Sequence, residues 1–104
     1  MIAETPKPPY YAVIFTSTRT EVVENYKEMN EAIEEAVKDA DGFLGVEACR
    51  EEVGISVSYW KDLESIRKWK NNPLHSLAKE KGKSAWFATF KTRIAKVEMD
   101  YDFL

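Results

Sequence analysis

The stretch FLGVEACREEVGISVSYW, residues 43–60, decides the fold. It contains two runs rich in strand-forming residues, 43–50 and 53–60, which only two glutamates separate. Strands that are joined this tightly must pair antiparallel. The second run alternates between two sets, which predicts opposite faces of a sheet: Val53, Ile55, Val57 and Tyr59 against Ser56, Ser58 and Trp60. Gly54, beside the turn, predicts a β-bulge.

Upstream of this hairpin, the sequence predicts one strand and one helix. Residues 10–18 are aromatic and β-branched, and their first six members are all apolar, so both faces of this strand favour burial. Thr18 and Glu21 have the spacing of a capping box, which predicts a helix from Thr18 to about Ala40. The apolar stripe of this helix comprises Val22, Tyr26, Met29, Ile33 and Val37.

Downstream of the hairpin, the sequence predicts two helical segments and a last strand. Asp62 caps the first segment, an Asn-Pro step interrupts it, and a new segment begins at Pro73. Trp86 lies in the connection to a strand from Phe90 to about Tyr101. The apolar phase of that strand slips by one residue, which predicts either a bulge or a strand that faces two surfaces. The order β-α-β-β-α-β is that of an α+β, ferredoxin-like fold.

The composition limits the classes of function. The 104 residues suffice for one domain, which we place at residues 10–104, behind an extended, proline-rich arm of residues 1–9. A net charge of -3 leaves no electrostatic footprint for nucleic acid or anionic lipid, so neither is an expected partner. The single cysteine, Cys49, excludes an internal disulfide and is expected to be buried, whereas the single histidine, His75, argues against a metal site.

The sequence favours a cytoplasmic protein. Residues 1–9 lack the basic and apolar segments of a signal peptide. The longest apolar run, Tyr10–Phe15, has six residues, whereas a membrane-spanning helix needs about 20. An unpaired cysteine also suits a reducing compartment.

The apolar pattern also predicts a homodimer. Two helical regions can cover only one face of a four-stranded sheet, yet the first and last strands carry apolar side chains on both faces. Soluble monomers rarely expose such a contiguous patch, and a second copy packed sheet to sheet would cover it. The alternative is a monomer whose long C-terminal strand folds over the open face.

Two segments carry a resemblance to a known family: the glycine-led segment 42–47, and segment 57–66, which contains Tyr-Trp and an acid-capped helix. Both resemble the antibiotic biosynthesis monooxygenase domain, above all its small uncharacterised bacterial members of the YqjZ type. Segments 72–75 and 86–90 extend the resemblance, which covers roughly residues 10–103. It implies a dimeric α+β barrel of two ferredoxin-like protomers, each with a substrate cavity between sheet and helices.

The resemblance implies two kinds of activity. Some members oxidise polycyclic phenols to quinones with O2 and no metal or organic cofactor, which makes a cofactor-independent monooxygenase of small aromatic phenols the leading hypothesis. Haem-degrading members carry an asparagine on the first strand, a tryptophan on the second helix and a haem-ligating histidine ten residues later. Trp69 matches the tryptophan, but Lys79 stands at the histidine position and the first strand offers only Thr16 and Ser17, which disfavours haem. The first alternative to the monooxygenase is a non-catalytic dimer that binds a small hydrophobic ligand or responds to stress, and haem binding or degradation ranks third.

Five residues are candidates for the site. His75 is the one side chain that titrates near neutral pH, so it is the candidate base for a phenolic proton, or else a helix histidine with no task. Trp69 offers a flat wall for an aromatic ligand, or plain core packing. Trp60 shares its face with small hydroxyls and is a second candidate wall. Tyr59 is either a donor to a substrate oxygen or a packed strand residue, and Trp86 either contacts substrate or plugs the end of the core.

Overall fold

The computed structural model describes residues 2–103, and its elements follow the predicted order. They are β1 (Tyr10–Arg19), α1 (Tyr26–Val37), β2 (Phe43–Arg50), β3 (Val53–Trp60), α2 (Leu63–Lys70), α3 (Pro73–Lys81), the π-helical turn η1 (Gly82–Trp86) and β4 (Phe87–Val97). The four strands form one sheet in the order β2-β3-β1-β4, and all neighbours pair antiparallel. This is the ferredoxin-like arrangement, so the predicted α+β protomer is confirmed. Met1 and Leu104, which end the expected arm and domain, lie outside the described residues.

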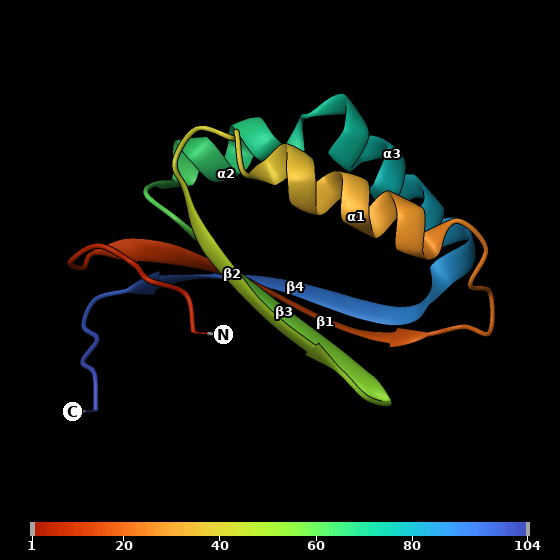
Figure 1. The fold of residues 1–104 in the computed structure, drawn as a ribbon, viewed down its shortest axis with the longest axis horizontal. Helices are drawn as coiled ribbons and strands as arrows, with labels where there is room; N and C mark the ends of the chain where they lie inside the picture. The colour runs from red at the N-terminus through yellow and green to blue at the C-terminus, as the bar shows by residue number, and fades with distance from the viewer. Residues whose placement is uncertain (1, 104) are drawn as a thin grey trace.

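All three α-helices lie on one face of the sheet, and both ends of the described chain lie on the other side (Figure 1). Val37 of α1, Trp60 of β3 and Ile66 of α2 are buried together between the layers, and Tyr11 and Val13 of β1 pack against them. Because partners in the register share a face, Val13 places Ser58 and Ile94 on the helix side. The predicted alternation in β3 is therefore confirmed, with the Trp60 set toward the helices.

The first helix begins later than the capping box predicts. Thr18 remains in β1, where it pairs with Thr89 of β4 and their hydroxyls are 2.6 Å apart. The backbone N–H of Thr20 then donates to the carbonyl of Trp86, which ties the following loop to η1. The helix consequently starts only at Tyr26, so the prediction of a cap at Thr18 is wrong, whereas the apolar stripe holds from Tyr26 onward.

The irregularities of the sheet lie elsewhere than predicted. Gly54 pairs regularly with Arg50, and the register of β2 and β3 shifts at Leu44 instead. In β4, Ile94 and Ala95 pair regularly with β1, so the phase slip reflects a strand with apolar residues on two surfaces, which was one of the two predictions. The shift in that pairing lies at the start of β4, opposite Arg19.

Local capping explains the start of α2 and α3. The Asp62 carboxylate accepts a hydrogen bond of 2.8 Å from the backbone N–H of Ser65 at the start of α2. The Asn72 side chain does the same for Leu74 and His75 at the start of α3, where Pro73 occupies the first turn. Both predicted starts are confirmed, and α3 places His75 in its first turn.

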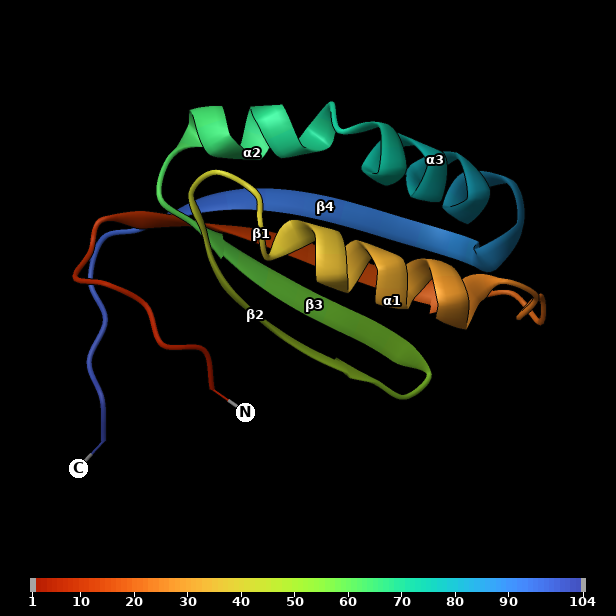
Figure 2. The ribbon, with the colours of Figure 1, turned by 45° about the horizontal axis from the view of Figure 1, so that its top comes forward.

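The terminal segments lie against the open face, the sheet surface that faces away from the helices, mainly at the end near Tyr10. The Tyr10 hydroxyl donates to the Asp100 carboxylate, and the backbone N–H of Ala3 donates to Glu47 at 2.9 Å. Both terminal segments lie near that end of the sheet (Figure 2). Farther along β3, Val53 and Ile55 remain 48% and 43% exposed. No helix among residues 2–103 has the length and apolar character to cross a membrane.

Candidate functional site

An imidazole and two indoles form a continuous series between the sheet and the second helical region. The ring centroids of Trp60 and Trp69 lie 6.4 Å apart at an interplanar angle of 31°. Those of Trp69 and His75 lie 5.4 Å apart at 50°. The series therefore runs from β3 through the last turn of α2 to the first turn of α3. It brings together three of the five candidate residues.

His75 is a base in an apolar setting. Its Nδ1 atom is buried and has no hydrogen-bond partner within the part of the chain that the structure describes. Burial lowers the pKa of His75 below its ordinary value, and the positive charges of Lys79 and Lys70 lower it further. A hydrogen bond with the Lys70 backbone carbonyl raises the pKa and offsets part of this effect. The imidazole is consequently neutral at pH 7 and can accept a proton.

Trp60 is a buried core residue whose indole N–H is already used. Its side chain is 1% exposed, and its indole N–H already donates to the Ser58 hydroxyl at 2.9 Å. The Phe43 ring packs against it at 5.4 Å and 71°, an edge-to-face geometry. Trp69 is half-buried. It is thus the more accessible of the two indoles beside His75.

Tyr59 and Trp86 lie away from this series. Tyr59 faces the open side of the sheet, where its hydroxyl donates to Glu47 at 2.6 Å, and this contact raises the pKa of Tyr59 to about 12. Trp86, in η1, donates its indole N–H to the Glu24 carbonyl at 3.0 Å and packs edge-on against Tyr26. The connecting position of Trp86 is confirmed, and its contacts are those of a residue that closes the end of the core.

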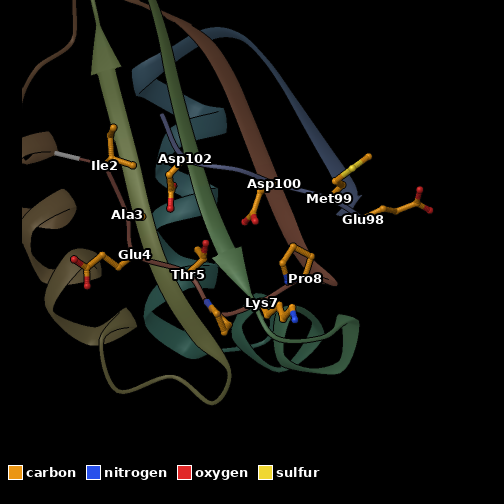
Figure 3. Close-up of a pocket in the computed structure, with 11 residues that line it drawn as sticks. Ile2, Ala3, Glu4, Thr5, Lys7, Pro8, Glu98, Met99, Asp100 and Asp102 are labelled. Carbon is orange, nitrogen blue, oxygen red and sulfur yellow. The ribbon is translucent and has the colours of Figure 1, made fainter. Parts of the chain in front are cut away.

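Two hollows lie on the other side of the sheet. The larger, about 890 Å³, lies between residues 2–8 of the arm and residues 98–102 after β4 (Figure 3). The smaller, about 470 Å³, is lined in part by Cys49, Ile55 and Val57. Cys49 is exposed there, so the expectation that it is buried is wrong: it points to the face that the helices do not cover. Neither hollow contains the His75 series.

One polar pair on the helix side of the sheet was not among the residues predicted from the sequence. The Arg50 guanidinium of β2 donates to the hydroxyl of Ser17, which is buried in β1. Only the strand register brings these residues together, since both pair with Gly54 of β3. The sequence indicated only, through the alternation along each strand, that Arg50 and Ser17 face the same side of the sheet.

The residue at the position of the family's haem ligand does not fit haem ligation. Lys79, at the position where the resemblance expects a histidine, is exposed. On the first strand, the residue that forms the polar pair with Arg50 is Ser17, not an asparagine. Separately from haem, residues 2–103 hold no cluster of three or more His, Cys, Asp or Glu side chains that could bind a metal ion.

Comparison with known proteins defines the family. A family model described as "Antibiotic biosynthesis monooxygenase" matches residues 9–81. The chain belongs to this family. The uncharacterized protein YqjZ of Bacillus subtilis (strain 168) is 44% identical over 99 residues, which cover 93% of this chain and 87% of that protein. The resemblance predicted from the sequence is confirmed.

Solved structures share the fold of this antibiotic biosynthesis monooxygenase domain. A variant of SnoaB from Streptomyces nogalater, described as a cofactor-independent oxygenase, matches with a TM-score of 0.74 at 10% identity, over 88% of this chain and 95% of that one. Rv0793 from Mycobacterium tuberculosis matches with a TM-score of 0.75 at 8% identity, over 88% and 97%. PA3566 from Pseudomonas aeruginosa matches with a TM-score of 0.70 at 15% identity, over 92% and 99%. At these identities the likeness shows the fold alone.

Proposed function

We propose that this chain is a cytoplasmic, cofactor-independent monooxygenase that oxidises a small aromatic or polycyclic phenol with O2. The family includes cofactor-independent oxygenases such as SnoaB. The observation that carries the proposal is the His75 imidazole against the Trp69 ring: its buried Nδ1 atom has no hydrogen-bond partner among residues 2–103, and burial lowers its pKa. A base of this kind beside a flat aromatic wall suits proton abstraction from a phenol.

The proposed reaction uses the electrons of the substrate. His75 takes the phenolic proton, and Trp69 supports the ring, so that an electron-rich phenolate forms in apolar surroundings. For an anthrone-type substrate, two C–H bonds of the ring methylene break and a C=O bond forms with one oxygen atom of O2. The second oxygen atom leaves as water, and all four electrons that reduce O2 come from the substrate.

Oxygen dependence tests this function. Dithranol, a dihydroxyanthrone, is incubated with the protein in air and under argon, with heat-denatured protein as the control for spontaneous oxidation. We expect quinone formation in air above the control rate, with one O2 consumed per quinone, and none under argon. A rate equal to the control across several anthrones contradicts the proposal. Thermal stabilisation by these compounds without turnover indicates the ligand-binding alternative instead.

We also propose that the working unit is a homodimer that packs through the open face. The support is the exposure of Val53 and Ile55 on that face, and the hollow beside Ile55 and Cys49. The arm reaches Glu47, and Ile2 lines the same hollow as Ile55, yet Val53 and Ile55 remain exposed, so this apolar surface is left for a second copy.

Light scattering tests the dimer. At micromolar concentration we expect a particle of twice the mass of the 104-residue chain. Ile55→Glu should shift the particle to the single-chain mass, because it places a charge in the proposed interface. Leu63→Glu, at an equally exposed position on α2, is the matched control and should leave the mass unchanged. A single-chain mass for the unmodified protein overturns this proposal.

A further inference from the structure

One row of residues across the sheet combines an arginine, a glycine without a side chain, a serine hydroxyl and a phenylalanine ring. Arg50 of β2 pairs with Gly54 of β3, Gly54 pairs with Ser17 of β1, and Ser17 pairs with Phe90 of β4. Residues that pair across neighbouring strands share a face of the sheet. Ser17 has the same parity in β1 as Val13, which packs into the core, so the whole row faces the helices.

The Arg50 guanidinium has fewer acceptors than it has donors. One of its terminal nitrogens, Nη2, donates to the Ser17 hydroxyl. The other, Nη1, is buried and has no hydrogen-bond partner among residues 2–103, and no carboxylate of these residues forms an ion pair with Arg50. A buried charged donor without an acceptor costs stability, so an acceptor from outside the chain would be bound favourably.

Gly54 makes room for this side chain. A Cβ atom at position 54 would overlap the guanidinium of Arg50, which crosses β3 at this point to reach Ser17. Gly54 has no left-handed backbone angle that would require a glycine. The absence of a side chain at position 54 therefore serves the position of Arg50, not a turn.

One phenylalanine ring lies near the guanidinium, and two more pack against that ring. The guanidinium carbon of Arg50 lies 5.9 Å from the centre of the Phe87 ring. Phe15 packs against Phe87 at 5.3 Å and against Phe90 at 5.7 Å. Phe90 is 41% exposed, so solvent reaches the cluster from its side. Such rings provide apolar walls next to a charged group that can orient a ligand.

We infer that this row is a binding site for a small aromatic carboxylate. The carboxylate would accept from Nη1 of Arg50, which matches its geometry, and the ring of the ligand would pack among Phe15, Phe87 and Phe90 after the Phe90 ring turns outward. Gly54 and Trp60 are six residues apart on β3, roughly 20 Å at the rise of a strand. The site is thus separate from the His75 series and does not rest on the proposed oxidation.

Binding of naphthoate tests the inference, with the neutral naphthylmethanol as its uncharged counterpart. Titration calorimetry under argon keeps binding separate from any oxidation. We expect the protein to bind naphthoate at least about tenfold more tightly than naphthylmethanol, as a charged hydrogen bond implies. Arg50→Met should remove this preference. Arg67→Met, which removes an exposed arginine on α2, is the matched control and should keep it. His75→Ala should keep it as well, even where oxidation is lost.

Thermal unfolding separates a ligand site from a structural arginine. Because Nη1 has no hydrogen-bond partner among residues 2–103, we expect Arg50→Met to melt at the same temperature as the unmodified protein or higher. Equal affinities for naphthoate and naphthylmethanol overturn the inference, as does naphthoate binding that Arg50→Met leaves unchanged. If the methionine variant does not fold, Arg50→Lys provides the test, because it keeps the positive charge but loses the paired N–H donors of the guanidinium. An unchanged naphthoate affinity in Arg50→Lys overturns the role of the guanidinium.

Discussion

Replacing Trp60 with alanine is expected to lower the free energy of unfolding by about 3–5 kcal/mol, the range for a large aromatic side chain lost from a core. Trp60 is almost completely buried and contacts both of the layers that form the fold. Its neighbours include Val37 of α1, Ile66 of α2 and Phe43 of β2. The substitution would leave a void that these separate elements cannot fill together. Urea denaturation at fixed protein concentration measures the loss, because association adds to the apparent stability.

Two further variants define the origin of this effect. Trp60→Phe keeps an aromatic ring but loses the hydrogen bond to Ser58, so its loss should be clearly smaller. Leu63→Ala removes an apolar side chain that is about half exposed on α2, and it should cost less than about 1 kcal/mol. A loss below that value for Trp60→Ala would show that the contact between sheet and helices is not the main core of the fold.

The order and faces of the elements were predictable because local patterns determine them. Alternation over residues 53–60 distinguished the two faces of β3, and Asp62 and Pro73 marked the starts of α2 and α3. The start of α1 was not predictable in this way. Thr18 has a capping pattern, but its pairing with Thr89, 71 residues away, keeps it in a strand. Contacts between distant segments decide between two local preferences of the same residues.

The candidate site was predictable only in part for the same reason. Trp69 and His75 are close in the sequence, so their packing follows from two short helices with an Asn-Pro step between them. The alternation that put Trp60 toward the helices also put Tyr59 on the opposite face, and the structure places Tyr59 against Glu47 there. Arg50 was missed because its contact with Ser17 depends on the register of three strands.

Replacing His75 with glutamine is expected to lower kcat/KM for dithranol oxidation by about 10²–10⁴-fold, the usual contribution of a general base. Glutamine retains polarity and approximate size but cannot accept the phenolic proton at neutral pH. Stability and dimer mass should change little, because the Nδ1 atom of His75 makes no hydrogen bond within residues 2–103. A residual rate close to that of the unmodified protein would exclude His75 as the base. The proposed role of Trp69 would then be limited to packing against the substrate ring.

The pH profile of kcat/KM distinguishes a histidine that acts as a base from one that is only structural. Burial lowers the pKa of His75, so the basic form persists below the ordinary histidine value of about 6.5, and the rate should fall only at more acidic pH. The glutamine variant should lack this acidic limb.

Lys79 is exposed on α3, and its positive charge contributes to the lowered pKa of His75. Lys79→Met should therefore move the limb to higher pH while the maximal rate stays the same. A limb that remains in the glutamine variant, or that does not move in Lys79→Met, would assign the titration to another group. The combination of a missing limb in one variant and a shifted limb in the other would identify His75 as the group whose neutral form is required for the reaction.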